Sequence, residues 1–282
     1  MADSETFLLA GVMGYPVMHS RSPLMHNFWF EKKMLNGRYL PLSIKPSDLE
    51  SGLRALSYLG FSGCNLTIPH KEEALKVVDD CDDVARKIGA INCVTVNPNN
   101  SLTGTNSDWY GFTASLNEEH PNWNVESGAV VVIGAGGAAR AVCYGLLSEG
   151  VSEIRLINRT KERAEVLAHD FGRVITPVDW RQRHESLSGA NLLVNTTSLG
   201  MAGQPSLDLC LDLLPTESVV YDLVYTPLET SLLFSAGNRG NKTINGLGML
   251  LHQAVLAWKS WFNIVPEVSN ELRQLILNDI HK

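Results

Sequence analysis

Short apolar runs rich in β-branched residues recur along the chain, and stretches with helical spacing lie between most of them. The runs cover residues 7–13, 39–44, 91–96, 129–133, 154–157, 192–194 and 219–223. Such alternation is typical of βαβ units, in which helices connect the strands of a mainly parallel sheet. The sequence therefore predicts an α/β fold.

The chain has 282 residues, a length typical of about two domains. A turn at residues 97–100 leads us to place the first boundary at residue 104, with the polar stretch 120–128 as the alternative. We predict a first α/β domain over residues 1–104, a second over residues 105–245, and C-terminal helices over residues 246–282.

Two helices can be predicted from side-chain spacing. Ser47 and Glu50 have the spacing of a capping box, which indicates a helix that starts there and turns Leu49, Leu53 and Leu56 to one side. Apolar residues of the segment 246–262 also keep helical spacing, so this segment should be a well-buried helix.

The charge balance disfavours a nucleic-acid partner. Lys and Arg number 23 against 30 Asp and Glu, a formal charge of -7, so no general basic field would gather phosphates. The early apolar stretch at residues 7–18 is broken by glycine and proline, and it is shorter than the ~20 residues that span a bilayer. We expect a small-molecule partner, with neither nucleic acid nor membrane.

The cysteines bear on the cellular compartment. Five scattered cysteines, with no Cys-x-x-Cys pair, are typical of a reducing environment and have no metal-ligand spacing. Asp3 and Glu5 stand where a secretory signal would need positive charge. We therefore expect a cytoplasmic protein with no metal site.

A glycine-rich turn directly follows the most apolar run. Residues 129–133 lead into Gly134, Ala135, Gly136, Gly137, Ala138 and Ala139, and helical spacing follows. In the order strand, turn, helix, the pattern G-x-G-x-x-A lets the backbone approach a pyrophosphate at a helix N-terminus. The sequence predicts a dinucleotide site here; an ordinary glycine-rich turn is the alternative.

The end of the next predicted strand distinguishes NADP from NAD. Asn158, Arg159 and Thr160 follow that strand, and Arg163 comes one helical turn later. An NAD site would place a carboxylate here, whereas a guanidinium can pair with a 2′-phosphate. Glu153 lies before the strand, at the wrong end. These residues favour NADP as the cofactor, against the alternative of a solvated helix start.

Two further stretches place polar residues beside Gly or Pro, and each is expected to follow a strand. Ser20 and Ser22 flank Arg21 before Pro23, where hydroxyls and free N–H groups could bind a carboxylate or could simply cap a helix. Lys71 is expected in a first helical turn. The helix dipole there disfavours the charged ammonium, so Lys71 would release its proton more readily and could take part in proton transfer. Most lysines are solvated surface groups, and the neighbouring His70 is an alternative acid–base group.

A third stretch combines an amide with a carboxylate. Asn92 follows Gly89-Ala90-Ile91, and Asp108 follows Asn106-Ser107. An amide and a carboxylate can together form hydrogen bonds with sugar-like hydroxyls, and the carboxylate can orient an ammonium group. Each residue taken alone could equally be part of an ordinary turn.

Taken together, these stretches resemble the shikimate dehydrogenase family over nearly the whole chain. The matching motifs are residues 19–23 (His-Ser-Arg-Ser-Pro), 65–73 (Asn-Leu-Thr-Ile-Pro-His-Lys-Glu-Glu), 89–92 (Gly-Ala-Ile-Asn), 106–108 (Asn-Ser-Asp), 134–140, 158–160 (Asn-Arg-Thr), 195–201, and 245–250 followed by Gln253. The resemblance implies NADP-dependent interconversion of 3-dehydroshikimate and shikimate, a step in aromatic amino acid precursor biosynthesis. It also implies a substrate domain, a Rossmann-type NADP domain, and C-terminal helices that return to the substrate domain.

The resemblance also implies roles for particular residues. Ser20 and Ser22, helped by Tyr225, would bind the substrate carboxylate. Thr67, Lys71, Asn92, Asp108 and Gln253 would surround the ring hydroxyls, with Lys71 and Asp108 as the catalytic pair, and which of the two donates the proton is left open. Residues beside the cofactor would be Thr196, Thr197 and Ser198, with Gly246 and Met249 near the nicotinamide; packing is the alternative for Met249.

Two departures from the family pattern bear on access to the ring: His70 stands where an aromatic residue is common, and Trp109-Tyr110 follow Asp108 where smaller residues are common. The alternatives are a quinate/shikimate dehydrogenase with broader substrate or NAD use, and a non-catalytic NADP-sensing protein. Ser20, Ser22 and Thr67 favour shikimate over quinate. Either a monomer or a homodimer is compatible with the sequence.

Overall fold

A computed structural model describes residues 7–281, so Asp3 and Glu5 lie outside the described residues. The chain forms two compact units. The first unit contains the residues up to Ser107 together with those from Leu251 onward, and the second unit contains Asp108–Leu250. The chain therefore passes between the units twice. The predicted boundaries at residues 104 and 245 fall a few residues earlier, and the first would cut a strand that continues to Thr105.

The first unit is built on a mixed sheet with the strand order β2-β1-β3-β5-β6-β4. Strands β1, β2 and β3 are parallel, whereas β5 runs antiparallel to both β3 and β6. Its strands are β1 (Leu8–Gly14), β2 (Gly37–Ser43), β3 (Gly63–Leu66), β4 (Asp80–Cys81), β5 (Cys93–Val96) and β6 (Leu102–Thr105).

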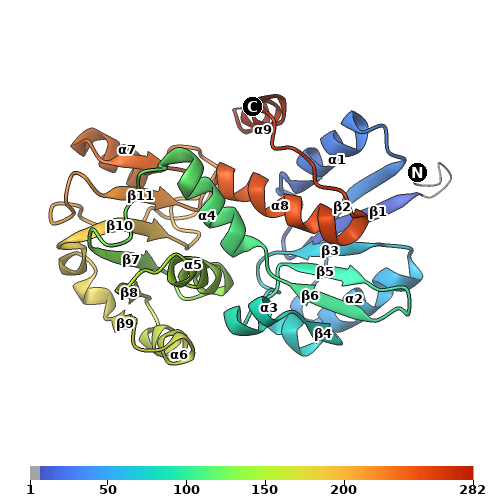
Figure 1. Cartoon of the computed structure of the whole chain (residues 1–282), viewed down its shortest axis with the longest axis horizontal. Coiled ribbons are helices and arrows are strands. Elements are labelled where there is room, and N and C mark those ends of the chain that lie inside the picture. The colour runs from blue at the N-terminus through green and yellow to red at the C-terminus, as the bar shows by residue number, and fades with distance from the viewer. Residues whose placement is uncertain (1–6, 282) are drawn as a thin grey trace. The chain divides into compact units, whose positions relative to one another are not determined.

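Helices from both ends of the chain complete this unit. They are α1 (Ser22–Lys32), α2 (Leu49–Tyr58), α3 (Asp83–Ile88), the part of α8 (Leu247–Phe262) from Leu251 onward, and α9 (Asn270–Ile280). Figure 1 shows α9 beside α1, and a salt bridge of 2.6 Å between Lys32 and Glu271 joins them. The predicted return of the C-terminal helices to the first unit is thus present.

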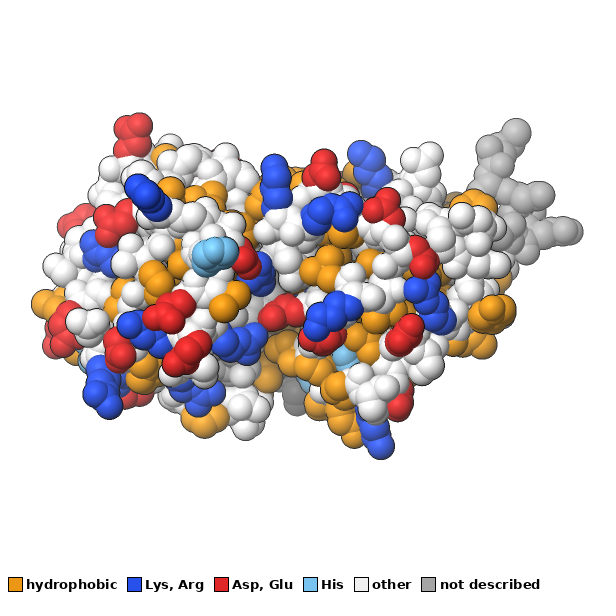
Figure 2. Space-filling model, turned by 90° about the horizontal axis from the view of Figure 1, so that it is seen from below, with side chains coloured by type: hydrophobic (Ala, Val, Ile, Leu, Met, Phe, Trp, Pro, Cys, Tyr) orange, Lys and Arg blue, Asp and Glu red, His pale blue; other side chains and the backbone are white. Residues whose placement is uncertain are grey.

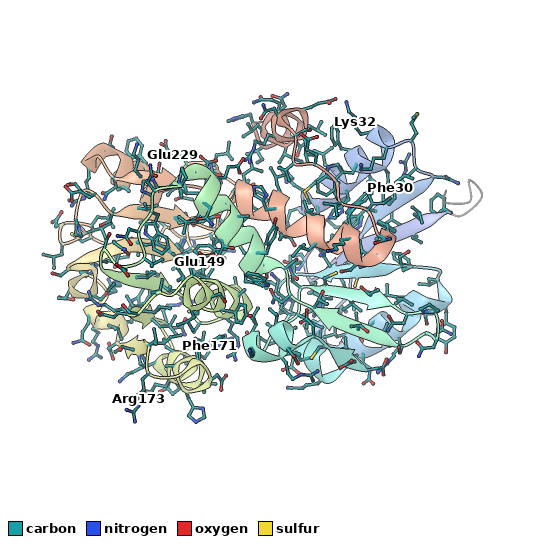
Figure 3. The ribbon with its side chains drawn as sticks, in the orientation of Figure 1. Phe30, Lys32, Glu149, Phe171, Arg173 and Glu229 are labelled. Atoms are coloured by element: carbon teal, nitrogen blue, oxygen red, sulfur yellow. The ribbon has the colours of Figure 1, made fainter. Side chains whose placement is uncertain are left out.

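Aromatic packing fixes α8 against α1 within the first unit. Phe30, labelled in Figure 3, has its ring centroid 4.8 Å from that of Trp258 and 5.5 Å from that of Phe262. Trp261 donates from Nε1 to the carbonyl of Val94 in β5 at 2.9 Å. These contacts bury α8 on the unit that carries the substrate motifs, as its apolar spacing predicts.

The second unit contains a parallel sheet with the strand order β12-β11-β10-β7-β8-β9. Renumbered within the unit, this is the order 6-5-4-1-2-3 of a Rossmann fold, in which ligands bind where the order reverses, between β7 and β10. The strands are β7 (Ala129–Ile133), β8 (Ile154–Ile157), β9 (Ile175–Val178), β10 (Ala190–Asn195), β11 (Val219–Asp222) and β12 (Lys242–Ile244).

The helices of this unit are α4 (Asp108–Glu119), α5 (Gly137–Ser148), α6 (Lys161–Phe171) and α7 (Ser231–Arg239), with the first turn of α8. Figure 1 shows α5 and α6 beside the strands that they connect. All of β7 is buried, as expected for a strand covered on both faces.

Several local predictions need correction. The capping box at Ser47 and Glu50 is wrong, because the Ser47 hydroxyl donates to the Asp48 side chain and the helix starts only at Leu49. Leu49, Leu53 and Leu56 are buried as predicted. The strand expected before the motif at residues 65–73 is present as β3, although no apolar run marks its bounds: its Gly-Cys-Asn-Leu sequence lacks β-branched residues, and it is paired with strands on both sides.

Within residues 7–281, no helix combines the length and apolar character needed to cross a membrane. On the face drawn in Figure 2, Lys and Arg side chains are interspersed with Asp and Glu.

Candidate active site

The residues of the candidate substrate site lie along one edge of the first sheet. The parallel strands β1 and β3 end there, and β5 begins there because it runs the other way. A hydrogen bond of 3.0 Å from the N–H of Thr67 to the carbonyl of Met13 holds the ends of β1 and β3 together. Gly14 is required at this point, because a Cβ there would lie 2.4 Å from the Cγ2 atom of Thr67.

Ser20 and Ser22 lie where α1 begins, at the same edge. The Ser20 hydroxyl accepts from the N–H of Ser22, the first residue of α1, at 3.2 Å, so Ser20 satisfies one N–H of the helix end although the N-cap residue is Arg21. Pro23 occupies the second helical position. Capping does not exclude carboxylate binding, because a helix N-terminus still offers other N–H groups and a favourable dipole.

Asn92 is the centre of a buried hydrogen-bond cluster. Its Nδ2 donates to Ser107 Oγ and to Gln253 Oε1, both at 3.1 Å, and its Oδ1 accepts from the N–H of Ser107 at 2.8 Å. The structure thus brings together Asn92 and Gln253, which are far apart in the sequence. Ser107 belongs to the motif at residues 106–108, but the sequence does not predict it as a site residue.

Tyr39 and Asn65 extend this cluster and were also missed as site residues. Tyr39 donates from its hydroxyl to Asn65 Oδ1 at 2.8 Å, and Asn65 Nδ2 donates to the carbonyl of Asn92 at 3.1 Å. Burial raises the pKa of Tyr39 well above its ordinary value, and a hydrogen bond with Ser22 opposes this shift in part. The hydrogen bonds therefore run from Tyr39 through Asn65 to Asn92. A buried tyrosine in an alternating strand, whose hydroxyl needs a partner, was the available sequence signal.

His26 packs flat against the Tyr39 ring, with centroids 3.9 Å apart and an interplanar angle of 2°. Its Nδ1 accepts from Trp258 Nε1 at 2.6 Å, and burial lowers the pKa of His26 to about 3. The imidazole is therefore neutral and holds the tyrosine ring in place.

Lys71 is half-buried, but it does not lie in an α-helix. Residues 73–76 form only a short 3-10 helix, so the expected effect of a helix dipole on Lys71 is wrong. Its position is fixed instead by its carbonyl, which accepts from the N–H of Ile91 at 2.9 Å. This bond places the Lys71 backbone next to the segment that leads into Asn92.

Asp108 is buried and begins α4 in the second unit, whereas Lys71 lies in the first. Their pairing stays a prediction.

His70 is buried, and its Nε2 lies 2.8 Å from the carbonyl oxygen of Ile44, so it is engaged as a core histidine. Trp109 packs on Tyr144 of α5 with centroids 5.6 Å apart.

The glycine turn of the second unit has the shape expected of a pyrophosphate site. Gly134 adopts φ 111°, and a Cβ there would lie 2.4 Å from Thr196 Oγ1. Gly136 is the N-cap of α5, and a Cβ at Gly136 would meet no atom within 4 Å. Since the first N–H groups of a helix have no acceptor within the helix, Gly137, Ala138 and Ala139 offer donors beside an open space.

Residues 196–198, which we call the cofactor loop after their predicted role, follow β10 directly and adjoin this turn. Thr196 donates from Oγ1 to the carbonyl of Ile133 at 2.7 Å, and Thr197 donates from Oγ1 to Asn195 Oδ1 at 2.7 Å. These bonds place the loop at the end of β7 and β10, where the strand order reverses.

Arg159 is exposed immediately after β8, and Arg163 is exposed in the first turn of α6. Asn158 Nδ2 donates to the carbonyl of Thr160 at 2.8 Å, which shapes the turn between them. Two guanidinium groups at this strand end can meet a 2′-phosphate.

Tyr225 is half-buried in the segment 223–227, which we call the substrate loop after the predicted role of Tyr225. Gly246 approaches this loop closely: its N–H donates to the carbonyl of Val224 at 3.0 Å, and a Cβ there would lie 2.0 Å from the carbonyl oxygen of Leu223. Met249 is buried in the hydrophobic core of the second unit, so its packing role is present and its contact with nicotinamide stays a prediction.

Among residues 7–281, no group of three or more His, Cys, Asp or Glu side chains is arranged to hold a metal ion.

Comparisons with known proteins match both units. Residues 12–94 match the family model of the shikimate dehydrogenase substrate binding domain, and residues 116–201 match that of shikimate / quinate 5-dehydrogenase. A shikimate dehydrogenase (NADP(+)) of Paramagnetospirillum magneticum is 54% identical over 96% of this chain and 98% of its own length.

Solved structures are similar over nearly the whole chain. Shikimate 5-dehydrogenase from Thermus thermophilus, in complex with NADP(H) and shikimate, has a TM-score of 0.84 and 36% identity, covering 96% of this chain and 99% of that one. Quinate dehydrogenase from Corynebacterium glutamicum, in complex with NAD, has a TM-score of 0.88 and 31% identity, covering 97% of this chain and all of that one.

Proposed function

Because this chain belongs to the shikimate dehydrogenase family, we propose that it catalyses the reversible, NADP-dependent reduction of 3-dehydroshikimate to shikimate. It is an NADP-dependent oxidoreductase that acts on a CH–OH group. The observation that carries the substrate assignment is the buried cluster of Asn92, Ser107 and Gln253, at the sheet edge where Thr67 lies. Amide groups held in this way suit a ring with several hydroxyls.

Two groups of residues divide the substrate between them. Ser20 and Ser22, at the start of α1, bind the carboxylate, and Tyr225 of the substrate loop assists. Thr67, Asn92 and Gln253 bind the ring hydroxyls. Hydroxyl and amide donors fixed by the fold lose little conformational entropy when they bind, so they orient the ring as well as hold it.

Lys71 and Asp108 form the catalytic pair. NADPH, when bound, supplies a hydride to the carbonyl carbon of 3-dehydroshikimate. As the carbonyl oxygen gains negative charge, the Lys71 ammonium, held by Asp108, stabilises that charge. The proton that completes the hydroxyl comes either from the Lys71 ammonium or from a protonated Asp108 carboxyl group. In the reverse direction the same residue removes this proton.

The described residues of the second unit fit NADP. The open space above Gly136 at the start of α5 accommodates a pyrophosphate, which the N–H groups of Gly137 and Ala138 can bind. Arg159, with Arg163, binds the 2′-phosphate, and Asn158 and Thr160 shape the turn. The residues of the cofactor loop, with Gly246 and Met249, flank the rest of the cofactor.

The first unit is the substrate domain and the second is the NADP domain. The protein works in the cytoplasm as a monomer or homodimer, with small molecules rather than nucleic acid or membrane as its partners. The free thiols of Cys64, Cys81, Cys93 and Cys143, all buried, are compatible with a reducing compartment.

A panel of substrates and cofactors tests this function. Purified protein is given shikimate, quinate or aminoshikimate, each with NADP or NAD, and nicotinamide absorbance is followed. We expect the fastest increase with shikimate and NADP. Preference for quinate with NAD would instead favour the activity named for the Corynebacterium glutamicum relative, and no increase with any combination would reject the proposal.

A further inference from the structure

Asp222 is a buried carboxylate to which the mechanism assigns no role. It ends β11 in the second unit and is 0% exposed. Its partners are three neutral donors: Asn195 Nδ2 at 2.9 Å and the N–H of Val224 at 3.0 Å reach Oδ1, and the Thr230 hydroxyl at 2.7 Å reaches Oδ2. These donors offset the cost of burying the carboxylate, but an apolar side chain would avoid that cost altogether, so stability alone does not require a carboxylate here.

The partners of Asp222 connect it to the cofactor loop. Asn195 is the last residue of β10, and its Oδ1 accepts from both the N–H and the hydroxyl of Thr197, at 3.1 and 2.7 Å. The Thr197 hydroxyl in turn accepts from the N–H of Leu199 at 3.1 Å. Asn195 thus holds the loop in one conformation, and Asp222 orients Asn195 by accepting from its Nδ2.

Asp222 is connected to the substrate loop as directly. The N–H of Val224 donates to its carboxylate, one residue before Tyr225. The loop is also held by a bond of 2.9 Å from the N–H of Ala202 to the carbonyl of Thr226. One carboxylate therefore accepts from the residue that holds the cofactor loop and from the backbone of the substrate loop.

We propose that Asp222 is a positioning residue that fixes the cofactor loop and the substrate loop relative to each other within the second unit. The inference rests on the proposed function, which places NADP beside residues 196–198 and the substrate carboxylate beside Tyr225. Thr230 is the outer support, since it caps α7 by accepting from the N–H of Leu233 while it donates to Asp222. Because polar networks in a buried site are cooperative, loss of the carboxylate should loosen both loops together.

The central variant is Asp222→Ala, which removes all three acceptor contacts. Asp222→Asn is the rescue variant, because its amide oxygen can still accept from Val224 and Asn195. Ser218→Ala is the matched control: Ser218 is also buried, precedes the same strand, and donates to the carbonyl of Ala190 at 2.6 Å, at the end of β11 away from both loops.

Three quantities are measured on the full chain: the Kd of NADP by calorimetry, the KM and kcat for shikimate, and the melting temperature. We expect Asp222→Ala to raise both the Kd of NADP and the KM for shikimate by about tenfold, the effect of one charge-assisted hydrogen bond. We expect Asp222→Asn to recover most of both losses, and Ser218→Ala to change the melting temperature but neither binding constant.

A change in both constants with Asp222→Ala, and not with Ser218→Ala, supports the inference. If Asp222→Ala leaves either constant unchanged, or if Ser218→Ala alters them equally, the inference is rejected. If Asp222→Ala does not fold, Thr230→Val replaces it, with Thr230→Ser as its control; unchanged constants in Thr230→Val then reject the inference.

The two proposals fail in distinguishable ways. If the unaltered protein does not oxidise shikimate, the proposed function fails, and with it the substrate half of the inference. The cofactor half is still decided by the calorimetric Kd of NADP. If the unaltered protein is active and the variants bind NADP and shikimate normally, only the inference fails.

Discussion

Replacing Tyr39 by Phe removes one buried hydroxyl and keeps the ring that packs on His26. The Tyr39 side chain is 1% exposed and Asn65 is 5% exposed, so water cannot readily replace the bond of 2.8 Å between them. An acceptor left buried without its donor costs about 1–3 kcal/mol. For a unit of this size, that predicts a fall in melting temperature of roughly 3–10 °C.

The variant should also affect one substrate selectively. Tyr39 is hydrogen-bonded to Asn65, which is bonded to Asn92, so loss of the Tyr39 hydroxyl should weaken the proposed substrate site of the first unit. We expect the KM for shikimate to rise by about threefold to tenfold, equivalent to one weakened hydrogen bond, while the KM for NADP is unchanged.

Steady-state kinetics with either substrate varied, together with thermal unfolding, measure both effects. Tyr58→Phe is the matched control, because Tyr58 is 88% exposed and its variant should behave like the unaltered protein. If Tyr39→Phe lowers the melting temperature but leaves the KM for shikimate unchanged, the hydroxyl stabilises the fold without positioning the site. If neither quantity changes, the reasoning from burial is refuted.

Three other predictions concern the second unit and the catalytic pair. Arg159→Ala should raise the KM for NADP by about tenfold or more and leave the KM for NAD unchanged. The control is Arg173→Ala, just beyond the other end of α6, which should change neither KM. An equal rise in KM for both cofactors in Arg159→Ala would exclude a 2′-phosphate contact. Lys71→Ala should lower kcat by about 10²–10⁴-fold while calorimetry still detects shikimate binding, and undiminished turnover would remove Lys71 from the mechanism. Burial raises the pKa of Asp222 from the ordinary 3.8 to about 6, so the native state holds this proton more tightly than the unfolded chain. As the pH rises from about 4 to about 6, the free energy of unfolding of the unaltered protein should therefore fall by about 2 kcal/mol relative to that of Asp222→Asn. Denaturant unfolding of both proteins measures this, and an equal difference between them at the two pH values would contradict the prediction.

The cofactor turn could be predicted because its pattern is local. Residues 129–139 carry strand, turn and helix in one uninterrupted stretch, so neighbouring positions alone indicate the structure. Short motifs predicted Ser20, Thr67 and Asn92 as substrate-site residues, and the structure places Thr67 and Asn92 at the same sheet edge.

The polar connections behind the site could not be predicted in the same way. Tyr39, Asn65 and Asn92 lie on or beside three different strands, and only the order β2-β1-β3-β5 brings them within hydrogen-bond distance. The predicted helical position of Lys71 is wrong because a local pattern was followed where the fold differs. The segment after Thr67 looks helical locally, but it forms turns and a short 3-10 helix.

The first unit takes its residues from both ends of the chain, and this has a consequence for synthesis on the ribosome. Trp29 donates to the carbonyl of Glu267, and His26 accepts from Trp258, so an N-terminal core depends on residues that are translated last. The second unit is continuous from Asp108 to Leu250 and can complete its core while the final segment is still being made. The usual order, in which the N-terminal domain matures first, is thus reversed. Nascent chains should acquire a protease-resistant second unit before the first unit becomes resistant.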